Sequence, residues 1–327
     1  MDKVNIDNHS QIVDAIEQDY LSENSNPSNN SNPSNNSNSS NSMSNSDTGC
    51  NCKKHNIQPV YSIGKIEFRY PNQSIQSEID EAWNRINSTK SIIPSPEEEI
   101  KKILLDPEHK YLAPELCYLL RIQNSEAFIL KPRYPSNYYQ LIKGLGRSIR
   151  YQEEGIDYQK EIFLELILGE KIGLATEEMC NGLIIPLVVV DQVYLFSLSE
   201  LSNGAWEAIN RRVTVTKEQF VEGFYELFNR IINLVDNAGE QDIHRAINYL
   251  ALRYAHIYRY HAEFKYNSTI NQQLTDIKFE KNSINQNRNI VSIFFNYDRI
   301  IGEPKKGIRV DVDVTGKFPF AVGIIIT

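Results

Sequence analysis

The sequence of 327 residues predicts an α+β domain in which a mostly antiparallel sheet packs against two long helices, preceded by a disordered arm. Three observations support this prediction. A segment near the N-terminus lacks aromatic and β-branched side chains, two long stretches later in the chain have helical apolar spacing, and alternating apolar residues flank these stretches on both sides. Strands, then helices, then strands again are typical of the α+β class.

The arm comes first along the chain. Residues 22–46 contain one charged residue, no aromatic residue and two copies of SNPSNN. Such a composition cannot bury enough apolar surface to offset the entropy of ordering, so we expect a disordered tether over residues 22–58. Residues 1–21 predict a short amphipathic helix, with Ile12, Val13, Ile16 and Tyr20 on one face. That helix either docks on a partner or on the chain's own domain, or is a frayed terminus.

The tether contains a Cys-x-Cys pair followed by a histidine, Cys50, Cys52 and His55. Thiolates and imidazoles are zinc ligands, but a structural zinc site usually has four of them and a longer cysteine spacing. Cys117 lies in a predicted strand and Cys180 near a turn, so neither completes the set. We expect at most a weak zinc site, or one that two chains share, and four cysteines in this length do not make a disulfide scaffold.

The domain at residues 59–327 begins with a strand in QPVYSIGKIEFRY and a helix near residues 75–86. Another helix is expected to begin after Ser95, which suits the N-cap. Pro96 suits the first helical position, and the three glutamates that follow suit the helix dipole. The next expected elements are strands at 116–122 and 127–131, a helix at 137–148, and strands at 162–169, 183–190 and 192–197.

Two long helices are expected at 217–237 and 241–261. The first starts with a Thr216-x-x-Gln219 capping box, and its apolar stripe comprises Phe220, Phe224, Leu227, Phe228, Ile231 and Val235. The second has one continuous face of Ile243, Ile247, Leu250, Tyr254, Ile257 and His261. Strands follow, most clearly in IRVDVDV, where the alternation places Asp311 and Asp313 on a solvated face.

Composition and motifs exclude several classes of function. The net charge of −8 argues against binding to nucleic acid or a membrane surface. No apolar run is long enough to span a bilayer, and the N-terminus lacks the apolar core of a signal peptide, so we expect a cytoplasmic protein. The chain has no G-x-S-x-G, H-E-x-x-H or Walker A motif, and Gly144-Leu145-Gly146 is expected to end a helix. We therefore assign no catalytic residue.

The second long helix contains the candidate binding residues Arg245, Tyr249, Arg253, His256 and Tyr260. On one helix they share a face beside the apolar stripe, where stacking, hydrogen bonds and cation–π contacts would hold a peptide. The alternative is an amphipathic helix whose tyrosines cover a second layer of core, with His261 as a hydrogen-bonded histidine at the core edge.

Three stretches resemble a known family. PVYSIG at 59–64, HRAINYLALRYAHIY at 244–258 and KKGIRVDVDVTGKFPFAVG at 305–323 are similar, in that order, to the start, the late helix and the last two strands of the C-terminal domain of the cyanobactin maturation protease PatG. A homologous domain ends the companion protease PatA. The resemblance spans about residues 59–327. The segment at 282–289 lacks the cysteines of some relatives, which puts a metal site there in doubt.

The resemblance implies a dimerising accessory domain without an assigned activity, from clusters that make ribosomally synthesised, post-translationally modified peptides. The subtilisin-like protease that normally precedes this domain is missing from the sequence. We expect a non-catalytic homodimeric protein that binds a precursor peptide, a maturation protease or a cyclodehydratase, with zinc as the only candidate cofactor. The alternative is a peptide-modifying enzyme that uses His256 or His261 with nearby tyrosines.

Overall fold

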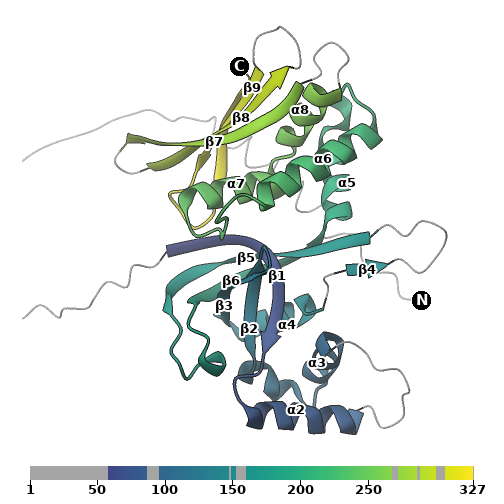
Figure 1. Ribbon diagram of the computed structural model, residues 1–327, viewed down its shortest axis with the longest axis vertical. Coiled ribbons are helices and arrows are strands. Elements are labelled where there is room, and N and C mark those ends of the chain that lie inside the picture. Colours follow the sequence, from purple (N-terminus) through teal and green to yellow (C-terminus); the bar gives the residue numbers. More distant parts are fainter. Residues whose placement is uncertain are drawn as a thin grey trace, which may run out of the picture. The chain divides into compact units, whose positions relative to one another are not determined.

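The structure, a computed structural model, describes residues 58–86, 96–146, 149–151, 160–266, 272–285, 288–299 and 306–326. The predicted helix at 1–21 and the tether, except for Gln58, lie outside the described residues. Within the described ranges, two sheets and several helices form the α+β fold that the sequence predicts (Figure 1). All described residues belong to one compact unit.

Strands from the first half of the domain close into a small barrel. They are β1 (Gln58–Arg69), β2 (Cys117–Ile122), β3 (Ser125–Pro132), β6 (Pro186–Ser197) and β5 (Lys160–Leu174), each paired with the next, and β5 also pairs with β1. The short β4 (Ile149–Tyr151) adds to β5. The pairs are antiparallel except β3 with β6, which is parallel. The two strands predicted at 183–190 and 192–197 are one continuous strand, β6.

The barrel closes because β1 changes partner at Gly64. Residues 58–64 pair with β5, and residues 65–69 pair with β2. A Cβ atom at Gly64 would lie 2.5 Å from the carbonyl oxygen of Arg121, closer than any side chain can approach. Glycine therefore permits the close backbone contact at the point where β1 passes from one neighbour to the other.

Several helices cover the barrel with apolar residues. They are α2 (Gln73–Ile86), α3 (Pro96–Leu105) and α4 (Pro135–Gly144), with a 3-10 turn, η1 (Lys110–Glu115). Ile79, Ile103, Leu112 and Leu141 of these elements are buried in one core with the barrel residues Val60, Ile66, Leu120, Phe128 and Val188.

The second half of the domain adds more helices and a second sheet. After α5 (Leu198–Ile209) and the 3-10 turn η3 (Asn210–Arg212) come α6 (Lys217–Ile232), α7 (Asp242–Arg253) and α8 (Ala255–Tyr266). The sheet contains β7 (Gln272–Asn285), β8 (Arg288–Arg299), β9 (Lys306–Asp313) and β10 (Phe320–Ile326), antiparallel in the order β10-β9-β8-β7. Its inner residues Ile293, Phe295, Val310 and Val312 are buried with the helices.

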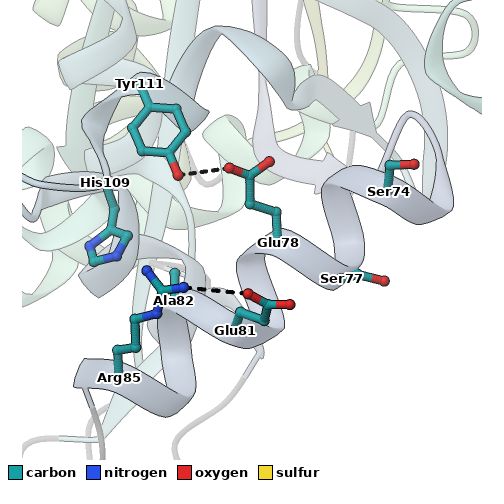
Figure 2. Close-up of a pocket in the computed structure, with 8 residues that line it drawn as sticks. All are labelled: Ser74, Ser77, Glu78, Glu81, Ala82, Arg85, His109 and Tyr111. Carbon is teal, nitrogen blue, oxygen red and sulfur yellow. Dashed lines mark hydrogen bonds and ion pairs between the residues drawn. The ribbon is translucent and has the colours of Figure 1, made fainter.

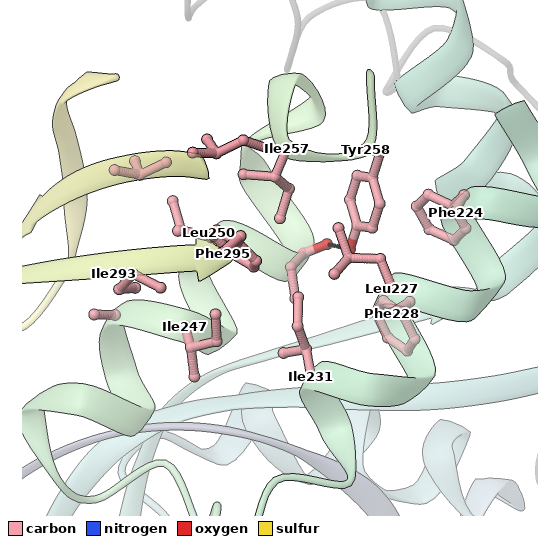
Figure 3. Packing of buried hydrophobic residues seen from close by; sticks show 14 of the residues in the cluster. Phe224, Leu227, Phe228, Ile231, Ile247, Leu250, Ile257, Tyr258, Ile293 and Phe295 are labelled. Atoms are coloured by element: carbon pink, nitrogen blue, oxygen red, sulfur yellow. Dashed lines mark hydrogen bonds between the residues drawn. The ribbon is translucent and has the colours of Figure 1, made fainter. Parts of the chain in front are cut away.

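The helices fill the core between the two sheets. Phe224, Leu227, Phe228 and Ile231 of α6 meet Ile247 and Leu250 of α7 and Ile257 and Tyr258 of α8, as Figure 3 shows. The same core contains Leu164, Leu166 and Leu168 of β5. Both sheets therefore contribute to one core, and this confirms the predicted packing of apolar helix stripes against sheet.

Three details of the second half differ from the prediction. α6 ends at Ile232 instead of residue 237, so Val235, which we placed in the apolar stripe, is 83% exposed. The helix predicted at 241–261 is broken at Tyr254, whose φ of −123° and ψ of 80° are not helical. Asp313 is buried rather than solvated, because its carboxylate accepts hydrogen bonds from Arg288 at 2.6 Å and the Thr315 amide at 2.8 Å.

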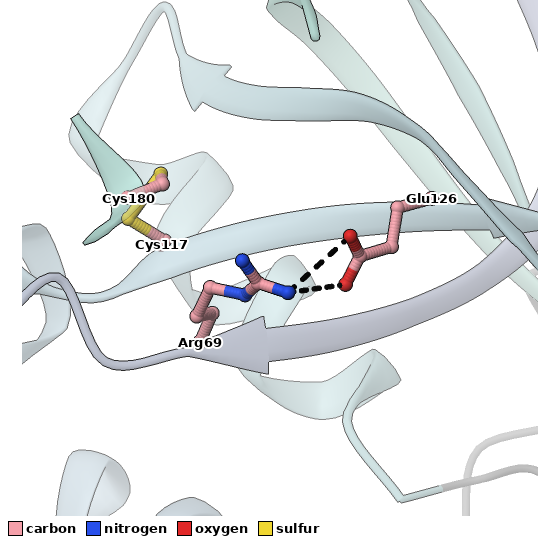
Figure 4. The surroundings of a disulfide bond; sticks show 4 residues. All are labelled: Arg69, Cys117, Glu126 and Cys180. Carbon is pink, nitrogen blue, oxygen red and sulfur yellow. Dashed lines mark hydrogen bonds and ion pairs between the residues drawn. A yellow bond between two sulfur atoms is a disulfide. The ribbon is translucent and has the colours of Figure 1, made fainter. Parts of the chain in front are cut away.

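A disulfide that the sequence did not predict joins Cys117 of β2 to Cys180, with Cα atoms 5.5 Å apart (Figure 4). Cys180 begins a 3-10 turn, η2 (Cys180–Gly182), in the connection between β5 and β6. Both cysteines are buried beside Leu119, Ile129 and Leu187. The bond ties this connection to the barrel.

No helix in the described ranges combines the length and the apolar character required to cross a membrane.

Candidate functional site

The break at Tyr254 divides the five candidate binding residues between two helices. Arg245, Tyr249 and Arg253 lie on α7, whereas His256 and Tyr260 lie on α8. The hydroxyl of Tyr258 donates to the carbonyl oxygen of Ala251 at 2.6 Å, so it satisfies an acceptor at the end of α7. The five residues therefore do not form the single helical face that the sequence predicted.

Arg245 is an internal anchor. Arg245 is only 2% exposed, and its Nη1 donates to the carbonyl oxygen of Val314 at 3.0 Å. Its Nη2 donates to the carbonyl oxygens of Gly316 and Lys317, the latter at 3.2 Å. Burial lowers the pKa of the guanidinium from its ordinary value, and nearby Asp242 opposes this. Arg245 holds the turn between β9 and β10, so we remove it from the candidate surface.

Tyr249 and Arg253 meet two tyrosines of the barrel. The ring of Tyr249 lies edge-on to Tyr61 of β1, with centroids 6.5 Å apart. The guanidinium of Arg253 lies 5.5 Å from the ring centroid of Tyr194 on β6. Arg253 is exposed and Tyr194 is 39% exposed. We call Tyr61, Tyr194, Tyr249 and Arg253 the tyrosine–arginine cluster.

The backbone around Gly239 brings α7 close enough to β1 to form this cluster. The Tyr61 amide donates to the Gly239 carbonyl oxygen at 2.8 Å, and Asn248 Nδ2 on α7 donates to the Tyr61 carbonyl oxygen at 3.0 Å. Gly239 has a φ of 74°, and a Cβ there would lie 2.3 Å from the Tyr61 oxygen. Only glycine combines that left-handed backbone with so close an approach.

The electrostatics of the cluster favour the neutral form of Tyr61. Burial raises the pKa of Tyr61 to about 12, and the charge and hydrogen bond of Arg253 oppose the rise. The Tyr194 hydroxyl donates to Gln192 Oε1 at 2.7 Å. The cluster thus presents aromatic rings and a cation at the surface, a combination suited to stacking, cation–π contacts and carboxylate binding.

The two candidates on α8 have other neighbours. The ring of His256 lies 5.4 Å from that of Tyr254, at the start of α8 and three residues after Arg253. The Arg259 guanidinium lies 5.2 Å from the ring centroid of Tyr260, which packs against Phe264. His256 therefore pairs with Tyr254, and Tyr260 belongs to a second aromatic–arginine pair further along α8.

His261, a candidate base in the enzyme alternative, lies in the core. It is 1% exposed, and its Nδ1 lies 3.0 Å from the hydroxyl of Tyr297 on β8. Its Nε2 lies 3.9 Å from Oε1 of Glu226, and the other carboxylate oxygen of Glu226 contacts Lys265. Burial lowers the pKa of His261 to about 4, with Glu226 opposing. A substrate would have to open the core to reach this ring, so the arrangement matches the core-edge histidine that the sequence offered as an alternative.

The proposed zinc ligands cannot be placed. Cys50, Cys52 and His55 lie outside the described residues. Cys117 and Cys180 are used in the disulfide. Within the ranges that the structure describes, no three histidine, cysteine, aspartate or glutamate residues are grouped as metal ligands would be.

A polar pocket of about 330 Å³ lies beside α2 (Figure 2). Several of its polar groups already have partners: the Tyr111 hydroxyl donates to Glu78 at 2.7 Å, Arg85 lies 3.4 Å from Glu81, and His109 lies 3.3 Å from Asp106, which is outside the lining. The hydrogen bond to Glu78 raises the pKa of Tyr111. Because these groups are engaged with one another, we assign no class of ligand to the pocket.

Tyr61 and Tyr194 were missed by the sequence reasoning. They lie on separate strands, far in sequence from α7, and a tyrosine in a strand pattern is ordinarily explained by packing. Only the tertiary contact between α7 and the barrel brings them to Arg253. The helical candidates Tyr249 and Arg253 were identifiable because their spacing is local.

Comparisons with known proteins agree with the resemblance. Residues 214–326 match the family model described as PatG C-terminal; this range covers α6 to β10 and two of the three resembling stretches. A solved structure described as "PatG Domain of Unknown Function" has a similar fold, with a TM-score of 0.61 and 16% identity, over 83% of this chain and 98% of that one. No curated protein matches the sequence. The chain therefore contains a PatG C-terminal-like domain, of a kind whose solved relative is described as having unknown function.

Proposed function

We propose that this chain is a non-catalytic accessory protein in the maturation of a ribosomally synthesised, post-translationally modified peptide of the cyanobactin type. In this proposal it binds the precursor peptide, or a maturation protease or cyclodehydratase that handles it, and works in the cytoplasm as a homodimer. The PatG C-terminal-like domain supports the context. The binding role rests on the geometry of the domain's surface.

The observation that carries the binding role is the tyrosine–arginine cluster. Arg253 is exposed above the half-exposed ring of Tyr194, and Tyr249 packs edge-on against Tyr61. An exposed cation on a fixed aromatic platform suits a peptide that offers a carboxylate or an aromatic ring. Tyr61 is hydrogen-bonded from below through its backbone, so the platform is preorganised.

The positions of the two histidines, His256 and His261, do not favour the enzyme alternative. His261 is enclosed in the core with Tyr297, whereas the ring of His256 lies against that of Tyr254 near the start of α8. A role in catalysis would therefore rest on His256 alone. His256→Ala in the maturation assay below would separate the two functions, because a binding surface tolerates loss of one residue better than a reaction tolerates loss of its base.

The experiment is intact-mass analysis of the precursor peptide encoded beside this chain's gene, co-expressed with the maturation enzymes with and without this protein. We expect more fully processed precursor with the wild type, and a clear loss of that gain with the double variant Arg253→Ala/Tyr194→Ala. Unchanged processing without this protein would contradict the proposed function. A gene neighbourhood without precursor, protease or cyclodehydratase would contradict its context.

The chain offers a matched control. Lys143 lies 4.4 Å from the ring centroid of Tyr139 on α4, another cation–aromatic pair, in which Tyr139 is exposed and Lys143 half-buried. Lys143→Ala/Tyr139→Ala removes the same chemistry from a different element. We expect this variant to support processing like the wild type, so that a loss in the cluster variant is assigned to its position.

A further inference from the structure

The two edges of the four-stranded sheet differ in their side chains. β7 and β10 are the outer strands in the order β10-β9-β8-β7. β7 bears the charged residues Asp276, Lys278, Glu280 and Lys281, of which the last three are exposed. Charges on an edge strand discourage pairing with another chain. The β7 edge is therefore protected in the usual way.

The β10 edge has the opposite character. Its sequence, FAVGIII, contains no charged residue and no proline. Five apolar side chains on β10 or just before it are each 48–52% exposed: Phe318, Phe320, Val322, Ile325 and Ile326. Singly exposed apolar residues are ordinary, but a contiguous run on a strand that pairs on one side only, among the described residues, marks an interaction surface.

The backbone of β10 is also regular enough to pair. A register shift lies between Ala321 and Gly323, and from Gly323 to Ile326 each residue pairs in sequence with Asp311 to Ile308 of β9. The outward backbone groups of that segment therefore form a regular edge, although the shift limits its length. A second strand added there would find apolar neighbours on both faces of the sheet.

We infer that β10 is the site at which a second copy of this chain pairs, antiparallel about a twofold axis, so that two four-stranded sheets become one. The inference rests on the proposed homodimer and names its interface. A twofold axis brings identical residues together, and a strand without charges does so with no like-charge repulsion. Ile324 and Ile326 would continue the inner row of side chains, and Ile325 the outer row.

The size of the contact sets its expected strength. A standard interface buries about 800 Å² on each partner, and one exposed strand with its neighbouring side chains offers less. We therefore expect a dimer that dissociates on dilution between about 1 mM and 1 μM. Association should also slow amide exchange in β10 with rising concentration, and leave exchange in β7 unchanged.

The test is sedimentation equilibrium of the full chain over that concentration range, with chelator, in a Cys50→Ser/Cys52→Ser background so that neither zinc nor these thiols link two chains. Ile325→Lys and, separately, Val322→Lys place a charge on this apolar edge, and the twofold axis brings two such charges into one interface. Each should raise the dissociation constant at least about tenfold while the circular dichroism spectrum and Tm stay close to those of the parent. Val235→Lys, at the 83% exposed site between α6 and α7, is the matched control and should dimerise normally.

The outcomes separate this inference from the proposed homodimer. A dimer that both edge variants preserve would overturn the β10 interface and leave the homodimer standing. A monomer at every concentration would overturn both. Assemblies that grow beyond the dimer would contradict the twofold arrangement, and loss of precursor binding by Ile325→Lys in a monomeric chain would assign the edge to the peptide instead.

Discussion

At the scale of single residues, burial decides which polar side chains are available to a partner. Arg245 and Arg253 lie on the same helix two turns apart, yet Arg245 donates to three backbone carbonyls while Arg253 stands exposed over Tyr194. Helical spacing in the sequence could not show which arginine is buried, because the burial of Arg245 depends on the turn after β9 lying against α7. Residue type and helical position predicted a face, and the tertiary fold selected its accessible part.

His261 makes the clearest residue-scale prediction. Its pKa is lowered from 6.5 to about 4 by burial. The unfolded state therefore binds a proton that the folded state does not between these values, so the free energy of unfolding falls as the pH drops from 6.5 toward 4. The linked loss is about 3 kcal/mol. We expect urea unfolding at pH 7 and pH 4 to show this loss in the wild type and a smaller one in His261→Gln.

The same histidine provides a direct spectroscopic check. In the wild type, the ring resonances of His261 should stay at their neutral positions until the pH is below 5. A midpoint near 6.5, or an equal pH dependence of stability in wild type and His261→Gln, would show that the ring is not held neutral in the core.

At the scale of elements, the apolar faces of α6 and α7 carry much of the packing. Phe224 stacks 5.8 Å from Phe228 and lies 4.3 Å from Tyr258, and both Phe224 and Leu250 are fully buried. Phe224→Ala or Leu250→Ala should each cost about 2–5 kcal/mol of unfolding free energy in urea titrations. Val235→Ala is the exposed control and should change stability by less than about 0.5 kcal/mol. Costs that small at both buried sites would refute the packing described here.

The disulfide makes a second prediction at this scale. It links two positions 63 residues apart and closes the turn in which Cys180, Asn181 and Gly182 all have positive φ. Cys117→Ser/Cys180→Ser should lower the free energy of unfolding by about 2–4 kcal/mol, chiefly by freeing the unfolded chain. Alkylation of both thiols in the native, unreduced protein, detected by mass spectrometry, would show that the bond does not form.

The elements that the sequence predicted are those with local signals. The capping box of Thr216 and Gln219 forms at the start of α6 as predicted, and so does the strand at residues 58–69. The break at Tyr254 was not predictable, because the apolar spacing continues through it. It depends on the Tyr258 hydroxyl and on the core around Phe224, which only the folded chain brings together. In the tyrosine–arginine cluster, Tyr249 and Arg253 were predictable from their helical spacing. Tyr61 and Tyr194 were not, because only the folded chain brings them there.

At the scale of the whole molecule, the weak or shared zinc site in the segment before the domain remains a prediction. If Cys50, Cys52 and His55 bind zinc, two chains pooling their ligands would satisfy it better than one. We expect less than one zinc per chain by elemental analysis, and no loss of maturation in Cys50→Ser/Cys52→Ser. One tightly held zinc per monomer, or loss of maturation while the dimer persists, would instead place the functional centre in this segment.

The central claim is that the tyrosine–arginine cluster binds the precursor peptide, and fluorescence anisotropy of labelled precursor titrated with the full chain tests it most directly. Cation–π and stacking contacts at partly exposed sites are worth about 1–2 kcal/mol. We therefore predict that Arg253→Ala/Tyr194→Ala binds roughly tenfold more weakly than the wild type, while Lys143→Ala/Tyr139→Ala binds equally well. Equal affinity of all three proteins, or no binding by the wild type, would contradict the claim.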